Sequence, residues 1–396
     1  MALAAAPAHA RAGSLYLHVP FCFHKCHYCD FYSLVDTRDR QAPFVDRLIE
    51  ELAALAPSAQ RPLQTIFVGG GTPSLLRTDL WERLLAALDR WYDLASIRAG
   101  SGEFTVECNP ETVTPDLTAT LRAGGVTRVS MGAQSFNRTH LKALERWHDP
   151  DNVPRALTLA RDAGISRASI DLIFAIPGQS LADVEQDLDT ALRLGVTHLS
   201  CYALTYEPHT AMTARLTRGE FQRADEDLEA DMFLLIRERL AAAGLSAYEV
   251  SNFARPGEEC RHNLAYWRQD SWLAAGPSAS GHLAGVRWKN APRLDDYLAS
   301  STDGFAPIVE FEPLDPRRAL AERLMTGLRL REGLDEADML DQAARLDHAA
   351  PARLRACAER HRRAGLMHPG PRWALTDSGI LIADRAAVEF LAALSP

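Results

Sequence analysis

Short apolar runs alternate with amphipathic stretches through the first two-thirds of the chain, and this alternation restricts the possible folds more than any other feature. Six runs that bear Val, Ile, Tyr or Phe are followed by turn residues and are predicted strands, at 15–19, 65–68, 104–107, 128–131, 169–174 and 198–202. Apolar side chains recur with helical spacing between them, which predicts helices at 44–55, 80–91, 115–123, 152–163 and 181–194. Elements in this order form parallel β–α units with right-handed crossovers. The sequence therefore predicts an α/β fold, a TIM-like partial (β/α)6 barrel with its functional side chains at the carboxyl ends of the strands.

The periodicity changes after about residue 206. A long helix is predicted at 224–243 and a strand at 248–253, and the segment 260–290 is rich in Gly, Trp and His. The remaining predicted elements are four helices and one short hairpin, at 319–328, 336–346, 352–364, 367–375 (the hairpin) and 385–394. We expect four regions, namely a disordered tail at 1–13, the barrel at 14–245, an extension of the barrel at 246–310, and a helical, winged-helix-like C-terminal domain at 311–396.

Charge and hydropathy exclude several classes of function. The chain has 396 residues, with 43 basic and 52 acidic side chains and a net charge of −9, whereas a protein that coats nucleic acid needs clustered positive charge. No apolar run approaches the roughly 20 residues of a membrane-spanning helix. Residues 1–10 lack the basic start and the apolar length of a signal peptide. A soluble, cytoplasmic protein with no nucleic-acid partner and no membrane span is predicted.

Three of the seven cysteines, Cys22, Cys26 and Cys29, fall within eight residues on the loop that follows the first predicted strand. The other four are scattered singly, so the pattern favours metal or cluster ligation over a disulfide framework. Three thiolates on one tight loop can bind three irons of a [4Fe–4S] cluster, which leaves the fourth iron open to a small chelating molecule.

The cysteine triplet fits a zinc site, a c-type haem site or a thiol redox pair less well. A zinc site would need one of the nearby histidines, His18, His24 or His27, as its fourth ligand. A c-type haem site requires a histidine after the last cysteine, and Asp30 follows Cys29. A thioredoxin-like redox pair would leave Cys22 without a role.

A glycine-rich loop, Gly69, Gly70, Gly71 and Thr72, comes directly after the second predicted strand. Its backbone can approach a ligand without side-chain obstruction, although a loop of this kind alone is weak evidence. It is not a P-loop, because no Gly-Lys-Ser/Thr sequence follows.

Polar side chains also follow the next three predicted strands. Glu107 ends the third, Gln134 follows the fourth, and Asp171 lies inside the fifth. A carboxylate within an apolar run costs several kcal/mol unless it is paired, so Asp171 is expected to face a ligand or a buried partner. Arg146 could supply a positive charge for a carboxylate ligand.

Several motifs together identify a family: Tyr16-x-His18-x-Pro20-x-Cys22, residues 66–73 (IFVGGGTP), Glu107-Cys108-Asn109-Pro110, Gln134-Ser135-Phe136, and His262-Asn263-Leu264-Ala265-Tyr266-Trp267. The chain resembles, over nearly its whole length, the haem-biosynthesis branch of the radical S-adenosylmethionine (SAM) proteins. That branch contains the oxygen-independent coproporphyrinogen III oxidases and the HemW haem chaperones.

The resemblance implies a [4Fe–4S] cluster on the three cysteines and a SAM molecule on its open iron, with an aromatic residue, here Tyr28, between the last two cysteines. It also implies SAM contacts from Tyr16, the loop from Gly69 to Thr72, Glu107, Gln134, Arg146 and Asp171. Charge suggests Arg146 for the methionine carboxylate and Glu107 for its ammonium group, with Gln134 and Asp171 on the ribose hydroxyls.

Two features separate the branches and favour the chaperones. The oxidases carry a further cysteine at the position of Phe31 and a longer N-terminal arm, and the chaperones carry the motif from His262 to Trp267. His262 is then a candidate haem ligand, but it could equally cap a turn while the aromatics fill a domain boundary. Cys260 is a less favoured iron ligand, and Ser278 stands where the resemblance leads us to expect glycine.

The resemblance therefore implies a haem chaperone that delivers haem to apo-haemoproteins such as apo-cytochromes, with an electron donor as a further partner if SAM is cleaved. The alternatives are a radical-SAM enzyme acting on a tetrapyrrole, such as the coproporphyrinogen oxidase, and a zinc-bound regulatory protein. No catalytic residue is assigned from the sequence.

Overall fold

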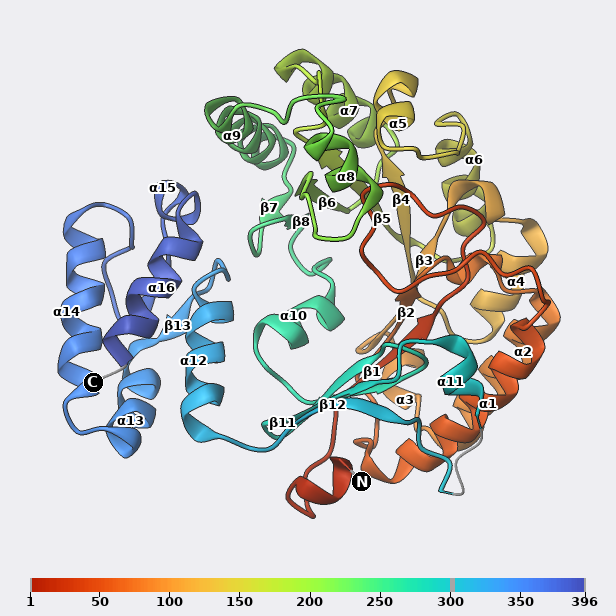
Figure 1. Ribbon diagram of the computed structural model, residues 1–396, viewed down its shortest axis with the longest axis horizontal. Helices are drawn as coiled ribbons and strands as arrows, with labels where there is room; N and C mark the ends of the chain where they lie inside the picture. The colour runs from red at the N-terminus through yellow and green to blue at the C-terminus, as the bar shows by residue number, and fades with distance from the viewer. Residues whose placement is uncertain (1, 300–302, 395–396) are drawn as a thin grey trace.

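Six parallel strands form the centre of the molecule in the computed structural model, which describes residues 2–299 and 303–394 (Figure 1). They lie side by side in chain order, as β1 (Ser14–Val19), β2 (Thr65–Gly70), β3 (Glu103–Cys108), β4 (Arg128–Gln134), β5 (Arg167–Phe174) and β6 (His198–Ala203). All six were predicted within three residues at either end. The α/β partial barrel is confirmed, and the carboxyl ends of its strands meet along one edge.

Helices connect these strands and cover the sheet. The main ones are α1 (Gln41–Leu55), α2 (Thr78–Trp91), α4 (Pro115–Ala123), α6 (Asn152–Asp162), α7 (Leu181–Arg193) and α9 (Glu226–Ala242). Their starts follow local chemistry, since Thr114 caps the Leu117 amide ahead of Pro115, and Ser180 forms a capping box with Asp183. Shorter helices are α3 (Ala95–Arg98), α5 (Arg138–Ala143) and α8 (Ala211–Thr217).

The sheet continues beyond the barrel on both sides. Past β6 lie the short strands β8 (Asn252–Ala254) and β7 (Ser246–Ala247), both antiparallel to their neighbours. The strand predicted at 248–253 is therefore mostly a turn, because the Glu249 carboxylate accepts hydrogen bonds from the Ser251 amide and the Asn252 side chain.

On the other side, β9 (Trp272–Ala275) pairs in parallel with β1. It is followed by an antiparallel series of β10 (Ser280–Leu283), β11 (Val286–Asn290) and β12 (Ile308–Glu312). The segment 260–290 thus contributes one helix, α10 (Arg261–Trp267), and three strands that the sequence did not predict. A short helix, α11 (Leu294–Leu298), packs near α1.

Residues 2–13 differ from the predicted disordered tail. Ala2–Ala5 forms a 3-10 turn, and Ala12 is completely buried, with its amide donating to the Ser58 carbonyl. Leu3, Ala6 and Ala10 pack on the main core, and this apolar burial holds the segment in place.

The C-terminal residues form a separate core beside the barrel (Figure 1). The helices α12 (Pro316–Gly327), α13 (Glu336–Leu346), α14 (Ala350–Arg363) and α16 (Ala383–Leu394) surround the buried Trp373 and Phe390. Two-residue strands, β13 (Leu334–Asp335) and β14 (Arg372–Trp373), complete a small ribbon, and Met367 bridges Leu375 in the predicted hairpin. The C-terminal region is thus helical, as predicted, and its winged-helix character stays a prediction. In the described residues, no helix has both the length and the apolarity needed to cross a membrane.

Candidate functional site

The cysteine loop begins at the carboxyl end of β1 and folds back on itself. The Cys22 amide donates to the Leu34 carbonyl at 2.9 Å, and the Leu34 amide donates to the Pro20 carbonyl at 2.8 Å. Cys26 is buried, whereas Cys22 and Cys29 are partly exposed. All three are free thiols on one closed loop, which is the donor set that a [4Fe–4S] cluster requires.

Side chains from two other loops, the one after β2 and the one between α5 and α6, reach these sulfurs. The Thr72 hydroxyl, after β2, donates to Cys22 Sγ at 3.6 Å. The Arg146 guanidinium, after β4, donates to Cys26 Sγ at 3.5 Å and to the Gly132 carbonyl at 3.0 Å. A cation and a hydroxyl next to sulfur stabilise the thiolate form, so the residues present fit a cluster.

The three histidines of the zinc alternative contact other protein groups, although the buried His24 Nε2 has no hydrogen-bond partner among the residues that the structure describes. His18 Nε2 lies 2.8 Å from the Tyr32 carbonyl, His24 stacks on Trp147 at 4.2 Å, and His27 Nδ1 lies 3.3 Å from Arg215 Nη1. In the described part of the chain, the one set of three His, Cys, Asp or Glu side chains with ligand atoms within 4.8 Å of one another is in the C-terminal region. The cysteine triplet does not converge on a single ion, which favours a cluster in which each thiolate binds a different iron.

The glycine-rich loop packs directly against the cysteine loop. The Gly71 amide donates to the Val19 carbonyl and the Thr72 amide to the Phe21 carbonyl, both at 2.7 Å. A Cβ atom on Gly70, whose φ is +105°, would lie 2.6 Å from the His18 ring. The glycines are therefore required by contacts within the protein, in addition to any contact with a ligand.

Glu107 is held at this loop from the end of β3. Its carboxylate accepts a hydrogen bond from the Gly70 amide at 3.2 Å, and a Cβ on Gly69 would lie 2.8 Å from the same oxygen. Burial, together with the negative charge of Asp171, raises the pKa of Glu107 to about 8. The structure thus brings Glu107, the glycines and the cysteine loop together.

Gln134 and Arg146 meet above a bulge at the end of β4. The ladder shifts register between Gly132 and Gln134, and Gln134 has a φ of +64°. A Cβ on Gly132 would lie 2.9 Å from the Gln134 amide nitrogen and 3.1 Å from Arg146 Nη2. The bulge therefore directs both predicted SAM residues to one place.

Asp171 has buried partners of its own. The Ser130 and Ser169 hydroxyls donate to Oδ1 at 3.2 and 3.5 Å. Burial raises the pKa of Asp171, against these and other hydrogen bonds. The residue is partly exposed, so the same carboxylate can also accept a hydrogen bond from a ligand.

The two predicted tyrosines are placed differently. The Tyr16 hydroxyl lies 3.1 Å from His18 Nδ1 and lines a cavity beside β1. Tyr28 packs against a small apolar cluster that includes Leu144, Ile173 and Met212. In this structure, Tyr28 therefore anchors the cysteine loop by packing against these apolar side chains.

His262 is enclosed by protein groups. It is 1% exposed, its Nδ1 lies 2.7 Å from the Thr65 hydroxyl, and its Nε2 lies 2.8 Å from the Tyr266 hydroxyl. The ring also stacks on Phe67 at 5.3 Å, and burial lowers the pKa of His262 to about 4. Both nitrogens are engaged, so this geometry does not support His262 as an iron ligand and favours the packing alternative.

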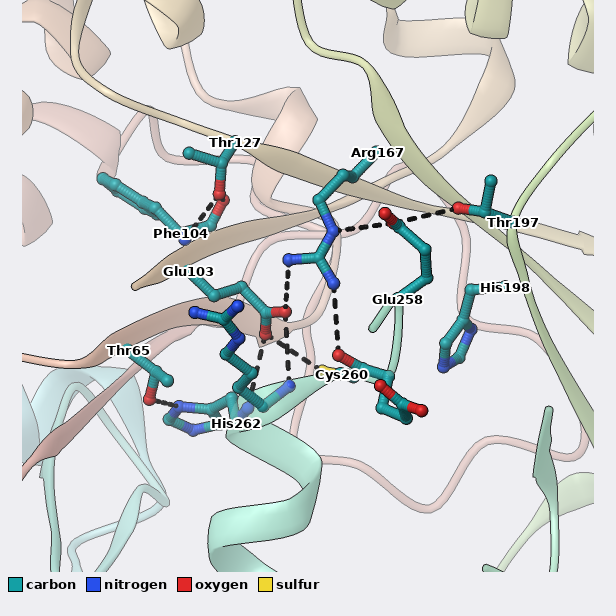
Figure 2. A network of polar contacts seen from close by, with 12 residues as sticks. Thr65, Glu103, Phe104, Thr127, Arg167, Thr197, His198, Glu258, Cys260 and His262 are labelled. Atoms are coloured by element: carbon teal, nitrogen blue, oxygen red, sulfur yellow. Dashed lines mark hydrogen bonds and ion pairs between the residues drawn. The ribbon is translucent and has the colours of Figure 1, made fainter. Parts of the chain in front are cut away.

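A buried carboxylate that the sequence interpretation missed anchors the start of α10 (Figure 2). Glu103, from β3, is fully buried and accepts hydrogen bonds from the Arg261 and His262 amides at 3.2 and 3.3 Å, and from Cys260 Sγ at 3.3 Å. Arg167, from β5, pairs with it at 3.2 Å and also with Glu258 at 2.9 Å. Cys260 is therefore a member of this network. Glu103, like Asp171, is a carboxylate beside an apolar run of residues. The argument that such a carboxylate must have a partner would therefore have identified Glu103 from the sequence as well.

An aromatic cavity of about 630 Å³ lies between β1, α10 and the added strands. Six aromatic side chains line it, namely Tyr16, Phe31, Tyr32, Tyr266, Trp267 and Trp272. Lys289, which pairs with Glu310 at 3.3 Å, and Asp30 contribute opposite charges, and Ser278, with a φ of +62°, contributes a hydroxyl. A cavity with flat aromatic walls and polar groups at its margin suits a planar ligand.

The profile of the radical SAM superfamily matches residues 16–191 of this chain. The chain is 40% identical over 316 residues to the heme chaperone HemW of Mycobacterium tuberculosis, covering 78% of this chain and 79% of that protein. It is 39% identical over 272 residues to the heme chaperone HemW of Escherichia coli, covering 68% and 70% respectively. The solved structure of the E. coli coproporphyrinogen III oxidase HemN, a radical SAM enzyme, superimposes with a TM-score of 0.81 over 98% of this chain and 92% of that one, at 22% identity, which shows a shared fold.

Proposed function

Because this chain belongs to the HemW haem chaperones, within the radical SAM superfamily, we propose that it binds haem and transfers it to apo-haemoproteins. It holds a [4Fe–4S] cluster and SAM beside the haem. Apo-cytochromes are recipients of the appropriate kind, and an electron donor is a further partner if SAM is cleaved.

The observation that carries the proposal is that one strand serves two sites. β1 supplies Tyr16 and His18 to the aromatic cavity, and its carboxyl end begins the loop that holds Cys22, Cys26 and Cys29. A porphyrin in the cavity would therefore lie next to the residues proposed for SAM. The aromatic walls would cover its faces, and Lys289 would pair with a propionate.

The cysteines would each bind one iron of the cluster, which when bound supplies an electron that can reduce SAM. Arg146, fixed by the Gly132 carbonyl, is placed to hold the methionine carboxylate. Glu107 would accept hydrogen bonds from the ammonium group, the Asp171 carboxylate would accept from a ribose hydroxyl, and the Gln134 amide could donate to or accept from one. These side chains are only partly exposed, which strengthens their electrostatic contacts relative to those on an open surface.

His262 keeps a role in this proposal, but not as the iron ligand. Its hydrogen bond to the Tyr266 hydroxyl holds that ring at the cavity wall, and Glu103 holds the helix that carries both residues. His262 is thus a positioning residue for the haem cavity.

Haem titration of the anaerobically reconstituted protein tests the proposal. Trp272→Leu removes an aromatic wall and Lys289→Gln removes the cationic group, and each should weaken haem binding by about tenfold, or 1.4 kcal/mol. Trp91→Leu and Lys142→Gln, which lie outside the cavity, are the matched controls and should bind as the wild type does. Equal affinities in all five proteins would refute the cavity as the haem site.

The cluster is tested separately. Cys22→Ser, Cys26→Ser and Cys29→Ser should each reduce bound iron and sulfide, whereas Cys108→Ser, a buried cysteine on β3, should not. Iron content that is unchanged by the three substitutions would contradict the assignment.

Turnover of coproporphyrinogen III with SAM and a reductant tests the alternative enzyme activity. Phe31 is exposed at the position where the oxidases carry a cysteine, and we expect no decarboxylation. Clear product formation would replace the chaperone proposal by the oxidase.

A further inference from the structure

Two helices of the C-terminal region bring a cysteine, a histidine and a glutamate together, far from the cluster loop in sequence. Cys357 and His361 are one helical turn apart on α14, and Glu389 faces them from α16. Cys357 is 0% exposed and His361 is 4% exposed, while Glu389 is partly exposed. One ligand atom from each residue lies within 4.8 Å of the other two.

The hydrogen bond of His361 fixes its tautomer. Nδ1 lies 3.0 Å from the Cys357 backbone carbonyl, which can only accept, so Nδ1 carries the proton. The Nε2 atom then presents a lone pair toward Glu389. A histidine that ligates a metal almost always donates its other N–H in this way, to a carbonyl or a carboxylate.

The separation between His361 and Glu389 has the length of a metal bridge. Nε2 and Oε2 are 3.6 Å apart, which is longer than a direct hydrogen bond. Two ligands of a tetrahedral zinc ion, with metal–ligand bonds of about 2.0–2.2 Å, stand roughly 3.4 Å apart. The Cys357 sulfur lies 3.9 Å from Nδ1 of the same ring, so its side chain must change rotamer to reach an ion bound at Nε2.

The second oxygen of the carboxylate is already held. Arg385, one turn earlier on α16, donates to Glu389 Oε1 at 3.1 Å, which leaves Oε2 directed at His361. The exposed side of Glu389 gives a cation a path from solvent, while the cysteine and histidine remain in the core.

We propose that Cys357, His361 and Glu389 form a binding site for a divalent cation of the zinc class, which clamps α14 to α16. A mixed sulfur, nitrogen and oxygen set suits zinc and cobalt and disfavours magnesium and calcium, which take oxygen ligands. Water completes the fourth position. The site is independent of the haem and SAM sites and would exist whether or not the proposed chaperone activity is correct.

Zinc binding by the cluster-loaded, full-length protein tests this proposal. After dialysis against zinc sulfate under anaerobic conditions, the wild type should retain about one zinc ion per chain beyond that in Cys357→Ser and His361→Gln, with iron content unchanged. Cys201→Ser, another buried cysteine, is the matched control and should retain the wild-type amount. Zinc-edge X-ray absorption should report one sulfur neighbour with nitrogen and oxygen.

Two results would overturn the proposal, namely equal zinc in the wild type, Cys357→Ser and His361→Gln, or a sulfur-rich zinc environment typical of the cysteine triplet. If Cys357→Ser or His361→Gln does not fold, Glu389→Gln decides, because this side chain is partly exposed and its replacement is isosteric. Glu389→Gln should weaken zinc binding at least about tenfold without changing the melting temperature of the zinc-free protein, and unchanged zinc affinity would refute the site.

Discussion

His262 Nε2 and the Tyr266 hydroxyl lie 2.8 Å apart, one helical turn from each other on α10. Tyr266 lines the aromatic cavity, whereas His262 is buried behind it. The geometry of one helical turn therefore connects a core imidazole to a ligand-facing ring.

This relationship predicts how the motif should respond to substitution. Tyr266→Ala removes a cavity wall and should weaken haem binding by about tenfold, whereas His262→Gln, which can still hydrogen-bond, should weaken it less. The Soret maximum of bound haem should be the same in His262→Gln and the wild type. A shifted maximum would show that His262 is the axial ligand after all.

The raised pKa of Glu107, about 8, predicts a pH dependence of SAM binding. Below pH 8 the carboxyl group is mostly protonated in the SAM-free protein, and an ammonium partner needs the ionised form. Affinity should therefore rise by up to about tenfold per pH unit between pH 6 and 8 and then level off, with proton release on binding. Calorimetry in buffers of different ionisation enthalpy measures both effects. Glu107→Gln should bind SAM weakly with no such rise, and a rise that persists in this variant would exclude Glu107 as its source.

Gly70 provides a test of the close packing between the two loops. Gly70→Ala places a Cβ 2.6 Å from the His18 ring at a φ of +105°, so it adds a steric conflict to the backbone strain. Gly125→Ala is the matched control, since its φ is +94° and nothing lies within 4 Å. We expect the control to cost about 1 kcal/mol in the free energy of unfolding, and Gly70→Ala to cost more and to weaken SAM binding. Equal losses in denaturant unfolding would show that His18 moves away freely.

Glu103 predicts a pH-dependent contribution to stability. Burial alone would raise the pKa of Glu103, but the charges of Arg128 and Arg167 and the hydrogen bond from the Arg261 amide lower it below its ordinary value of 4.5. The stabilisation is therefore complete above pH 4.5 and is lost as the pH falls through the lower pKa of the folded state.

Glu103→Gln should accordingly destabilise the protein by about 3 kcal/mol at pH 7, because it leaves buried arginine charge without its partner. The difference from the wild type should shrink in unfolding experiments below pH 4.5. Glu258→Gln, whose side chain is partly exposed and pairs with the same Arg167, is the control and should cost less. A pH-independent difference would mean that Glu103 acts through shape and not through charge.

The left-handed backbone conformation of Ser278 predicts that a substitution at this position can stabilise the protein. Its φ of +62° is a left-handed conformation that costs a residue with a Cβ roughly 1 kcal/mol, and glycine avoids this cost. Ser278→Gly should therefore raise the free energy of unfolding by up to about 1 kcal/mol, whereas Ser278→Val should lower it. Thermal unfolding of the cluster-loaded protein measures both. A loss of haem affinity in Ser278→Gly would instead show that the hydroxyl contacts the ligand.

The barrel could be predicted from the sequence because each of its strands is a short, continuous apolar run followed by a turn, a signal contained in neighbouring residues. The strands β9, β10 and β11 were missed because they are short and closely spaced, with Gly276 and Gly285 in the turns between them, and because β9 pairs with β1, more than 250 residues earlier. Long-range pairing of this kind leaves little local pattern.

In the functional site, too, some features could be predicted from the sequence and others could not. The positions of Cys22 and Glu107 follow from their places at strand ends, whereas Arg146 comes after α5 and is brought to the same edge by the fold. The environment of His262 could not be predicted, because Thr65 and Glu103 reach it from other strands. The chemistry of a residue is visible in the sequence, but its hydrogen-bond partners are set by the tertiary fold.

The added strands have a consequence for the edges of the sheet. An open barrel ending at β1 and β6 would present two long rows of unpaired backbone groups, which invite pairing with another polypeptide. Here one border is β7, only two residues long, and the other is β12, which exposes Glu310 and Glu312 alongside the apolar Val309 and Phe311. A second copy adding to β12 would have to bring its own acidic residues against these. The short border at β7 and the acidic side chains at β12 therefore both oppose the pairing of two copies edge to edge.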